Sequence, residues 1–136
     1  MELWNKADKI LKRNALIKIG SRFINNLNIP RNVELKEIIV NSPTSPKGTR
    51  FEMAGFLNQM TLYDDDNSVS AIVYLGLDRN KIKEPKLPVI FDIDVFSLDV
   101  IQNENTKINE NLNKLRVFKN SIFFNSLTPK GVELYQ

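Results

Sequence analysis

The sequence contains no cysteine and no histidine among its 136 residues. These absences exclude zinc sites built on those residues, thiol nucleophiles, and catalysis that depends on imidazole. Ser68, Ser70 and Thr128 therefore have no histidine to activate them, and the chain has no GxSxG motif. A non-catalytic role is favoured over an enzymatic one, and no cofactor is expected.

Long apolar runs are also missing. No stretch of about 18 apolar residues is present, so no transmembrane helix and no membrane partner are expected. The first four residues lack the basic start and apolar run of a signal peptide. Together with the absence of cysteine, these features predict a cytoplasmic protein. The length and the ordinary apolar and charged fractions, 42% and 26%, fit a single globular domain over residues 1–136.

Charge is spread unevenly along the chain. Residues 1–50 hold ten Lys/Arg and four Asp/Glu, a net +6, whereas residues 51–136 hold nine and twelve, a net −3. Such asymmetry can mark a surface for nucleic acid, but it can equally mean that the two halves pair within the fold. No basic run is longer than two residues, which favours pairing within the fold.

The most strongly β-patterned stretch is Leu87 to Val95, LPVIFDIDV. Side chains alternate between the two faces of a strand, so one face of this stretch is apolar without a break and should lie on a core. The opposite face carries Asp92 and Asp94 among apolar residues. Buried carboxylates need water or a cationic partner.

Three further segments have strand patterns. They are Ala15–Ile29, Arg50–Tyr63 and Ser68–Asp78. The last two are separated by Asp64-Asp65-Asp66-Asn67, a turn composition, and are predicted to form a hairpin. Residues 41–49 contain two prolines and a glycine and are predicted to be a loop.

Helical patterns lie mainly at the two ends of the chain. Apolar residues recur at helical spacing in Glu2–Lys12 and over residues 106–124. Thr128 and Pro129 predict a short terminal helix, and residues 32–40 predict a helical turn or two capped by Asn32.

Consecutive strands with short links predict an α+β fold, with an antiparallel sheet of about four strands and the N- and C-terminal helices packed on one face. The first helix starts almost at residue 1, with little capping sequence before it. This abrupt start suggests that the chain is the C-terminal part of a longer protein.

Three stretches resemble conserved blocks of one family. They are Ile19–Asn25, Phe91–Val95 and Phe123–Thr128, which are similar to an RIGLRYIN block, a DID strand and a closing F..SLT block. The family is a sporadically distributed group of uncharacterised bacterial proteins that are longer than this chain. The chain departs from the pattern at Lys18, where the family often has arginine, and at Ser21, where it has a larger apolar residue. The resemblance implies that this chain is a bacterial C-terminal half, and it implies no activity.

Asp92 and Asp94 are the residues with the clearest chemical potential. They should lie roughly 7 Å apart on one strand face, a spacing that suits Mg²⁺ or Mn²⁺. A metal-dependent phosphoryl enzyme would need a third acid, and no pattern in the sequence places Glu52, Asp99 or Glu110 beside the pair. Structural ion pairs are the favoured interpretation, because Lys18 and Arg22 share a strand face and the same two-residue spacing.

Two loops invite other interpretations that the sequence supports poorly. Asp64-Asp65-Asp66 suggests calcium, but the EF-hand pattern fails, because Val69 and Leu75 occupy its glycine and glutamate positions. Residues 46–50 form a small basic loop without a phosphate-binding motif. Nucleic-acid binding would use a basic set made up of Lys18, Arg22, Lys47, Arg50, Lys81 and Lys83.

The C-terminal region is rich in apolar side chains that exceed what one small sheet needs. Phe118, Ile122, Phe123 and Phe124 are the candidate interface residues. We therefore expect a protein-interaction or accessory module that binds a protein partner or forms a homo-oligomer. The alternatives are a nucleic-acid-associated module and a metal-dependent phosphoryl enzyme on Asp92 and Asp94.

Overall fold

The structure is a computed structural model that describes residues 16–44, 46–48, 50, 54–78 and 85–135. The helix expected over Glu2–Lys12 lies outside these described residues. Among them, no helix is both long enough and apolar enough to cross a membrane.

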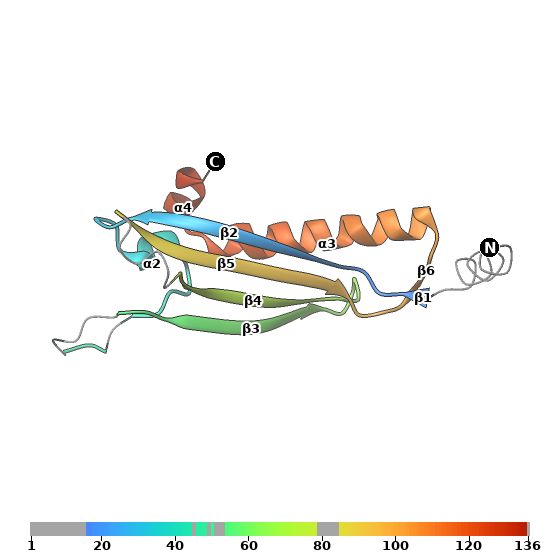
Figure 1. The fold of residues 1–136 in the computed structure, drawn as a ribbon, viewed down its shortest axis with the longest axis horizontal. Coiled ribbons are helices and arrows are strands. Elements are labelled where there is room, and N and C mark those ends of the chain that lie inside the picture. The colour runs from blue at the N-terminus through green and yellow to red at the C-terminus, as the bar shows by residue number, and fades with distance from the viewer. Residues whose placement is uncertain (1–15, 45, 49, 51–53, 79–84, 136) are drawn as a thin grey trace, which may run out of the picture.

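A four-stranded antiparallel sheet forms the centre of the fold, in the order β2-β5-β4-β3 (Figure 1). Its strands are β2 (Gly20–Pro30), β3 (Leu57–Asp64), β4 (Val69–Leu77) and β5 (Lys86–Ser97). A two-stranded ribbon at one end pairs β1 (Leu16–Ile17) with β6 (Ile101–Gln102). The predicted α+β class with a four-stranded antiparallel sheet is confirmed.

The alternation of side chains along the strands divides the sheet into two different faces. On β5, Val89, Phe91, Ile93 and Val95 are buried, and the odd-numbered residues of β4 lie beside them in register. These side chains form one continuous apolar face. The predicted hairpin is confirmed, since β3 pairs with β4 around the turn at residues 64–69. Its first strand begins at Leu57, however, and not at Arg50 as the sequence pattern predicted.

Helix α3 (Asn105–Ser126) covers the apolar face (Figure 1). It contacts β5 and its two neighbours, β4 and β2, and its Leu115 and Ile122 are buried. Phe123 stacks on Phe91 with ring centroids 5.6 Å apart. The expected apolar stripe is therefore present, although its member Leu112 is exposed.

The C-terminus is anchored by a contact between two short helices, α2 (Leu35–Ile38) and α4 (Pro129–Leu134). The backbone N–H of Thr128 donates to the carbonyl of Ile38 at 2.8 Å, and Thr128 also caps α4 by accepting from the N–H of Gly131. The predicted Thr128–Pro129 helix start is confirmed. These contacts place the chain end beside residues 34–40, far from it in sequence.

Two details of the sequence interpretation were wrong. Glu34, not Asn32, precedes α2, and it forms a reciprocal capping box with Glu37 that satisfies the N-terminal N–H groups. The strand expected over Ala15–Ile29 is interrupted after Ile17, where the buried Ser97 hydroxyl accepts from the N–H of Ile19 at 3.0 Å. The chain thereby passes from the β1–β6 ribbon into the main sheet.

Candidate interaction surface

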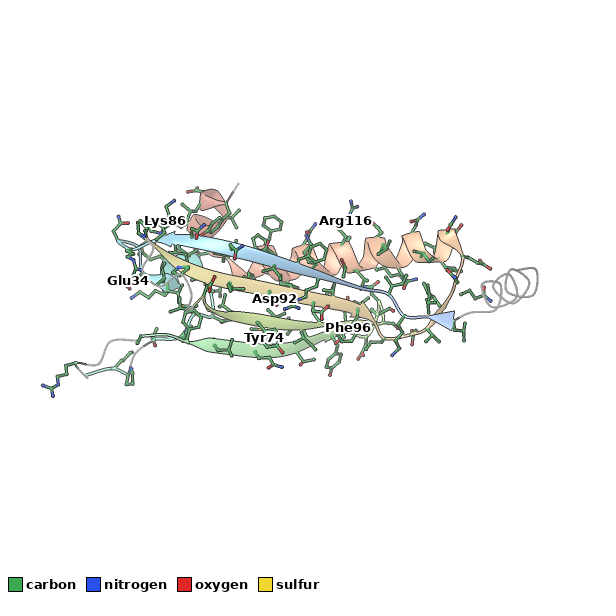
Figure 2. All side chains as sticks on the ribbon, viewed as in Figure 1. Glu34, Tyr74, Lys86, Asp92, Phe96 and Arg116 are labelled. Carbon is green, nitrogen blue, oxygen red and sulfur yellow. The ribbon has the colours of Figure 1, made fainter. Side chains whose placement is uncertain are left out.

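The second face of the main sheet is not covered by α3, and we call it the open face. The even-numbered residues of β2, β5 and β4 and the odd-numbered residues of β3 point to it, because they alternate with the buried ones. Figure 2 labels three of them, Asp92 and Phe96 on β5 and Tyr74 on the neighbouring β4. The open face combines acidic, basic and apolar side chains, so it is the first place to look for a site.

A bidentate ion pair lies at the centre of the open face. The Nε atom of Arg22 donates to both carboxylate oxygens of Asp92, at 3.0 and 3.1 Å, and its Nη2 donates to Oδ2. The Asp92 side chain is 9% exposed, whereas that of Arg22 is 59% exposed. The guanidinium therefore screens a nearly buried carboxylate from water.

The electrostatics of this pair follow from its geometry. The hydrogen bonds and charge of Asp92 raise the pKa of Arg22, and the charge of Asp94 adds to the effect. Arg22 is thus held cationic and is already engaged by a carboxylate. The Nε and Nη2 groups of Arg22 are therefore engaged by Asp92, which makes the pair a structural ion pair of the sheet.

The structure brings Arg22 to Asp92 but leaves Lys18 apart from both aspartates. Gly20 pairs with Phe96, so Lys18 lies beyond the paired part of β2, where it is exposed. Among the described residues, no group of three or more acids is close enough to hold a metal ion. The third acid that a metal-dependent enzyme would need is therefore not found beside Asp92 and Asp94 in this part of the chain.

A shallow hollow of about 460 Å³ opens beside the ion pair. Gly76 lines the hollow and has no side chain to fill it. A Cβ atom at this position would lie 3.0 Å from the carbonyl oxygen of Phe56 and 3.1 Å from the side chain of Leu57. The hollow is lined by Arg22, Leu57, Ile72, Tyr74, Gly76, Leu77, Ile90, Asp92 and Asp94. Its walls combine apolar side chains with the charged Arg22, Asp92 and Asp94.

The basic residues considered for nucleic acid do not form one patch with Arg22. Lys18 precedes β2, whereas Lys47 and Arg50 precede β3, whose start lies at the opposite end of the sheet (Figure 1). Lys47 and Arg50 are exposed. Lys81 and Lys83 lie outside the described residues.

Two other sequence candidates have structural roles. Asp64 accepts from the backbone N–H of Asn67 at 3.3 Å and from its side-chain amide at 2.8 Å, which closes the hairpin turn. These bonds lower the pKa of Asp64. Glu52 lies outside the described residues, whereas Asp99 and Glu110 are exposed.

The C-terminal aromatic cluster belongs largely to the core. Ile122 is buried, and Phe118 and Phe123 are half-buried. Phe124 packs edge-on against Phe123, and the residue is 49% exposed. Phe124 is therefore the one member of the four candidate interface residues that remains mostly accessible.

The sequence interpretation did not single out the edge of the sheet formed by β3. Leu57 and Tyr63 are 72% and 69% exposed, the highest exposed fractions among the large apolar side chains described. Met60, on the same strand, is 37% exposed at the mouth of a groove of about 300 Å³ between β3 and α3. The sequence feature that could have indicated this edge is the eight-residue run LNQMTLYD, whose only charged residue is the aspartate at its end.

Comparison of the chain with protein-family models, with curated proteins and with solved structures finds no match. The resemblance to the uncharacterised bacterial family therefore stays a prediction, and function has to be argued from the surface itself.

Proposed function

We propose that this chain is a non-catalytic protein-interaction module that associates with another protein chain, with a second copy as the favoured occupant. The observation that carries this proposal is the exposure of two large apolar side chains along β3, an edge strand of the described sheet. Leu57 and Tyr63 at the β3 edge and Ile24 at the β2 edge are more than half exposed. A strand of another chain that paired with the β3 edge would cover part of the Leu57 and Tyr63 side chains.

The chemistry of the open face supports association and not catalysis. Its one buried carboxylate is already satisfied by Arg22, and the described residues place no third acid beside it. No specific contact or charge cluster in the described part of the chain favours the nucleic-acid alternative. We therefore argue a single function.

Sedimentation velocity over a wide concentration range, together with chemical cross-linking in extracts of the source cells, tests the proposal. We expect a mass above the 15.7 kDa of one chain, or a cross-linked partner that the variant Leu57→Lys loses. Val117→Lys is the matched control, because Val117 is an exposed apolar residue on α3. A chain that stays monomeric at every concentration and yields no cross-linked partner contradicts the proposal.

A further inference from the structure

Strand β3 lies at the edge of the sheet, and within the described part of the chain no strand pairs with its outer side (Figure 1). The N–H of Leu77 donates to the carbonyl of Phe56 at 3.3 Å, so Phe56 and Leu77 form a hydrogen-bonded pair. Hydrogen-bonded and non-hydrogen-bonded pairs alternate along an antiparallel ladder. The even-numbered residues of β3 therefore form backbone hydrogen bonds to β4. The backbone N–H and C=O groups of the odd-numbered residues point away from β4, and these residues are Leu57, Gln59, Thr61 and Tyr63.

This edge lacks the devices that usually block strand addition. It has no proline and no lysine, and its only charge is Asp64 at the last position. The other edge strand, β2, differs, because it carries Arg22 and ends at Pro30, which has no N–H to donate. An exposed, nearly uncharged strand of eight residues is a template for another strand.

We propose that β3 pairs antiparallel with β3 of a second copy, in the register that places Met60 opposite Met60 of that copy. The inference rests on the proposed association and specifies its geometry. The two four-stranded sheets would join into one continuous sheet around a two-fold axis at Met60.

The register follows from the positions of the outward groups. In an antiparallel pair of two β3 strands, each residue with outward backbone groups must lie opposite another such residue. All of these residues have odd numbers, so the two numbers of each pair add up to an even number. The register centred on Met60 pairs Leu57 with Tyr63 and Gln59 with Thr61 of the second copy, and it uses every outward residue of β3. Shifting the strand by two residues in either direction leaves at least one of them unpaired.

Side chains favour the same register. This register places Leu57 directly opposite Tyr63 of the second copy, on the open face. Leu57 and Tyr63 are the two most exposed large apolar residues described. Side chains directly opposite each other in neighbouring strands contact one another, so this register brings an aliphatic side chain against an aromatic ring. Asp64 would lie opposite Phe56, so no two like charges meet along the paired strands.

Met60 suits the position on the two-fold axis. It points to the α3 side, where its side chain lines the groove with Leu62, Leu75 and Ile122. Two flexible methionine side chains at a non-hydrogen-bonded position, whose Cα atoms lie about 4.5 Å apart, can fill the space between the two grooves.

Single cysteines test the register directly, because the native chain has none. Diamide oxidation should convert Met60→Cys into a disulfide-linked dimer, since the two Cα atoms would lie within bonding range. Gln59→Cys and Thr61→Cys, each alone, should not cross-link, because their own copies would lie roughly 9 Å apart. An equal mixture of these two variants should cross-link with each other.

A proline variant tests the role of the outward backbone. Thr61→Pro removes one outward N–H group and leaves the ladder to β4 intact, so the domain should fold but dimerise at least tenfold more weakly. Thr61→Val keeps the N–H and should dimerise normally. Circular dichroism of both variants confirms the fold.

The outcomes separate the inference from the proposed function. A dimer in which Met60→Cys does not cross-link, or in which Gln59→Cys alone does, overturns the register and leaves self-association standing. A monomer that cross-links to a different protein overturns self-pairing and leaves the interaction module standing. A monomer without any partner overturns both.

Discussion

Arg22 bonds to Asp92, although the residue directly opposite it in the strand pair is Asp94. The guanidinium therefore crosses the strand pair diagonally. Asp92 itself lies between Ile24 on β2 and Tyr74 on β4, and it has little access to water. Arg22 is thus the cation that makes burial of this carboxylate possible, since an unpaired buried charge is costly.

The first prediction concerns this ion pair. Replacing Arg22 by methionine should lower the free energy of unfolding, because it leaves a nearly buried carboxylate without its donor. Lys18→Met is the control, since Lys18 is exposed and lies outside the paired part of β2. Urea unfolding measures both variants.

A double-mutant cycle separates the pair from general packing. In an Asp92→Asn background, Arg22→Met should lower the free energy of unfolding by less than it does in the native chain. Equal costs in the two backgrounds would show that Arg22 acts through packing alone.

The second prediction concerns the contact between α2 and α4. A Cβ atom on Gly131 would lie 2.4 Å from the carbonyl oxygen of Ile38, so the two helices must separate to accept a larger residue. Gly131→Ala should therefore lower stability by about 1–3 kcal/mol. Gly55→Ala should change it little, because the nearest atom there is 3.9 Å away. Thermal unfolding of the two variants decides between these outcomes.

The periodicity of the sequence was sufficient to predict the main elements of the fold. The apolar parity of Leu87–Val95 identified the buried face of β5, and the acidic turn between two alternating segments identified the β3–β4 hairpin. Contacts between distant segments were not predictable. The antiparallel bridge between Ile39 and Leu127, for example, joins residues far apart in sequence, and no local pattern encodes their proximity.

The candidate surface was predicted less well than the fold. Spacing put Arg22 and Asp92 on strand faces that can meet. The register, which sets Arg22 opposite Asp94 and leaves Lys18 outside the paired strand, and the diagonal reach of Arg22 to Asp92 were not predictable from it. The β3 edge could not be recognised either, because a strand becomes an edge only through the order of the whole sheet. Edge strands and central strands can have the same alternating sequence pattern.

The third prediction concerns pH and the hairpin turn. Asn67 donates two hydrogen bonds to the Asp64 carboxylate and lowers its pKa. A lowered folded-state pKa gives stability that is present above the ordinary value of about 4 and is lost as pH falls through the folded value. Urea unfolding should thus show native protein more stable than Asp64→Asn near neutral pH, with a smaller difference at about pH 3. Asp65→Asn, in the same turn, is the control, and a pH-independent difference for Asp64→Asn would contradict the assignment.

The fourth prediction tests which face of α3 meets the sheet. Leu112 and Leu115 are three residues apart on the same helix, but Leu115 is 1% exposed and Leu112 is 41% exposed. Leu115→Ala should cost about 2–5 kcal/mol, because it removes buried methyl groups and leaves a cavity between α3 and the sheet. Leu112→Ala should change stability by less than about 0.5 kcal/mol, as is usual for an exposed position. Both substitutions have the same helix propensity change, so their difference in urea unfolding reports burial alone. Similar costs at the two positions would mean that α3 is rotated about its axis relative to the arrangement described above.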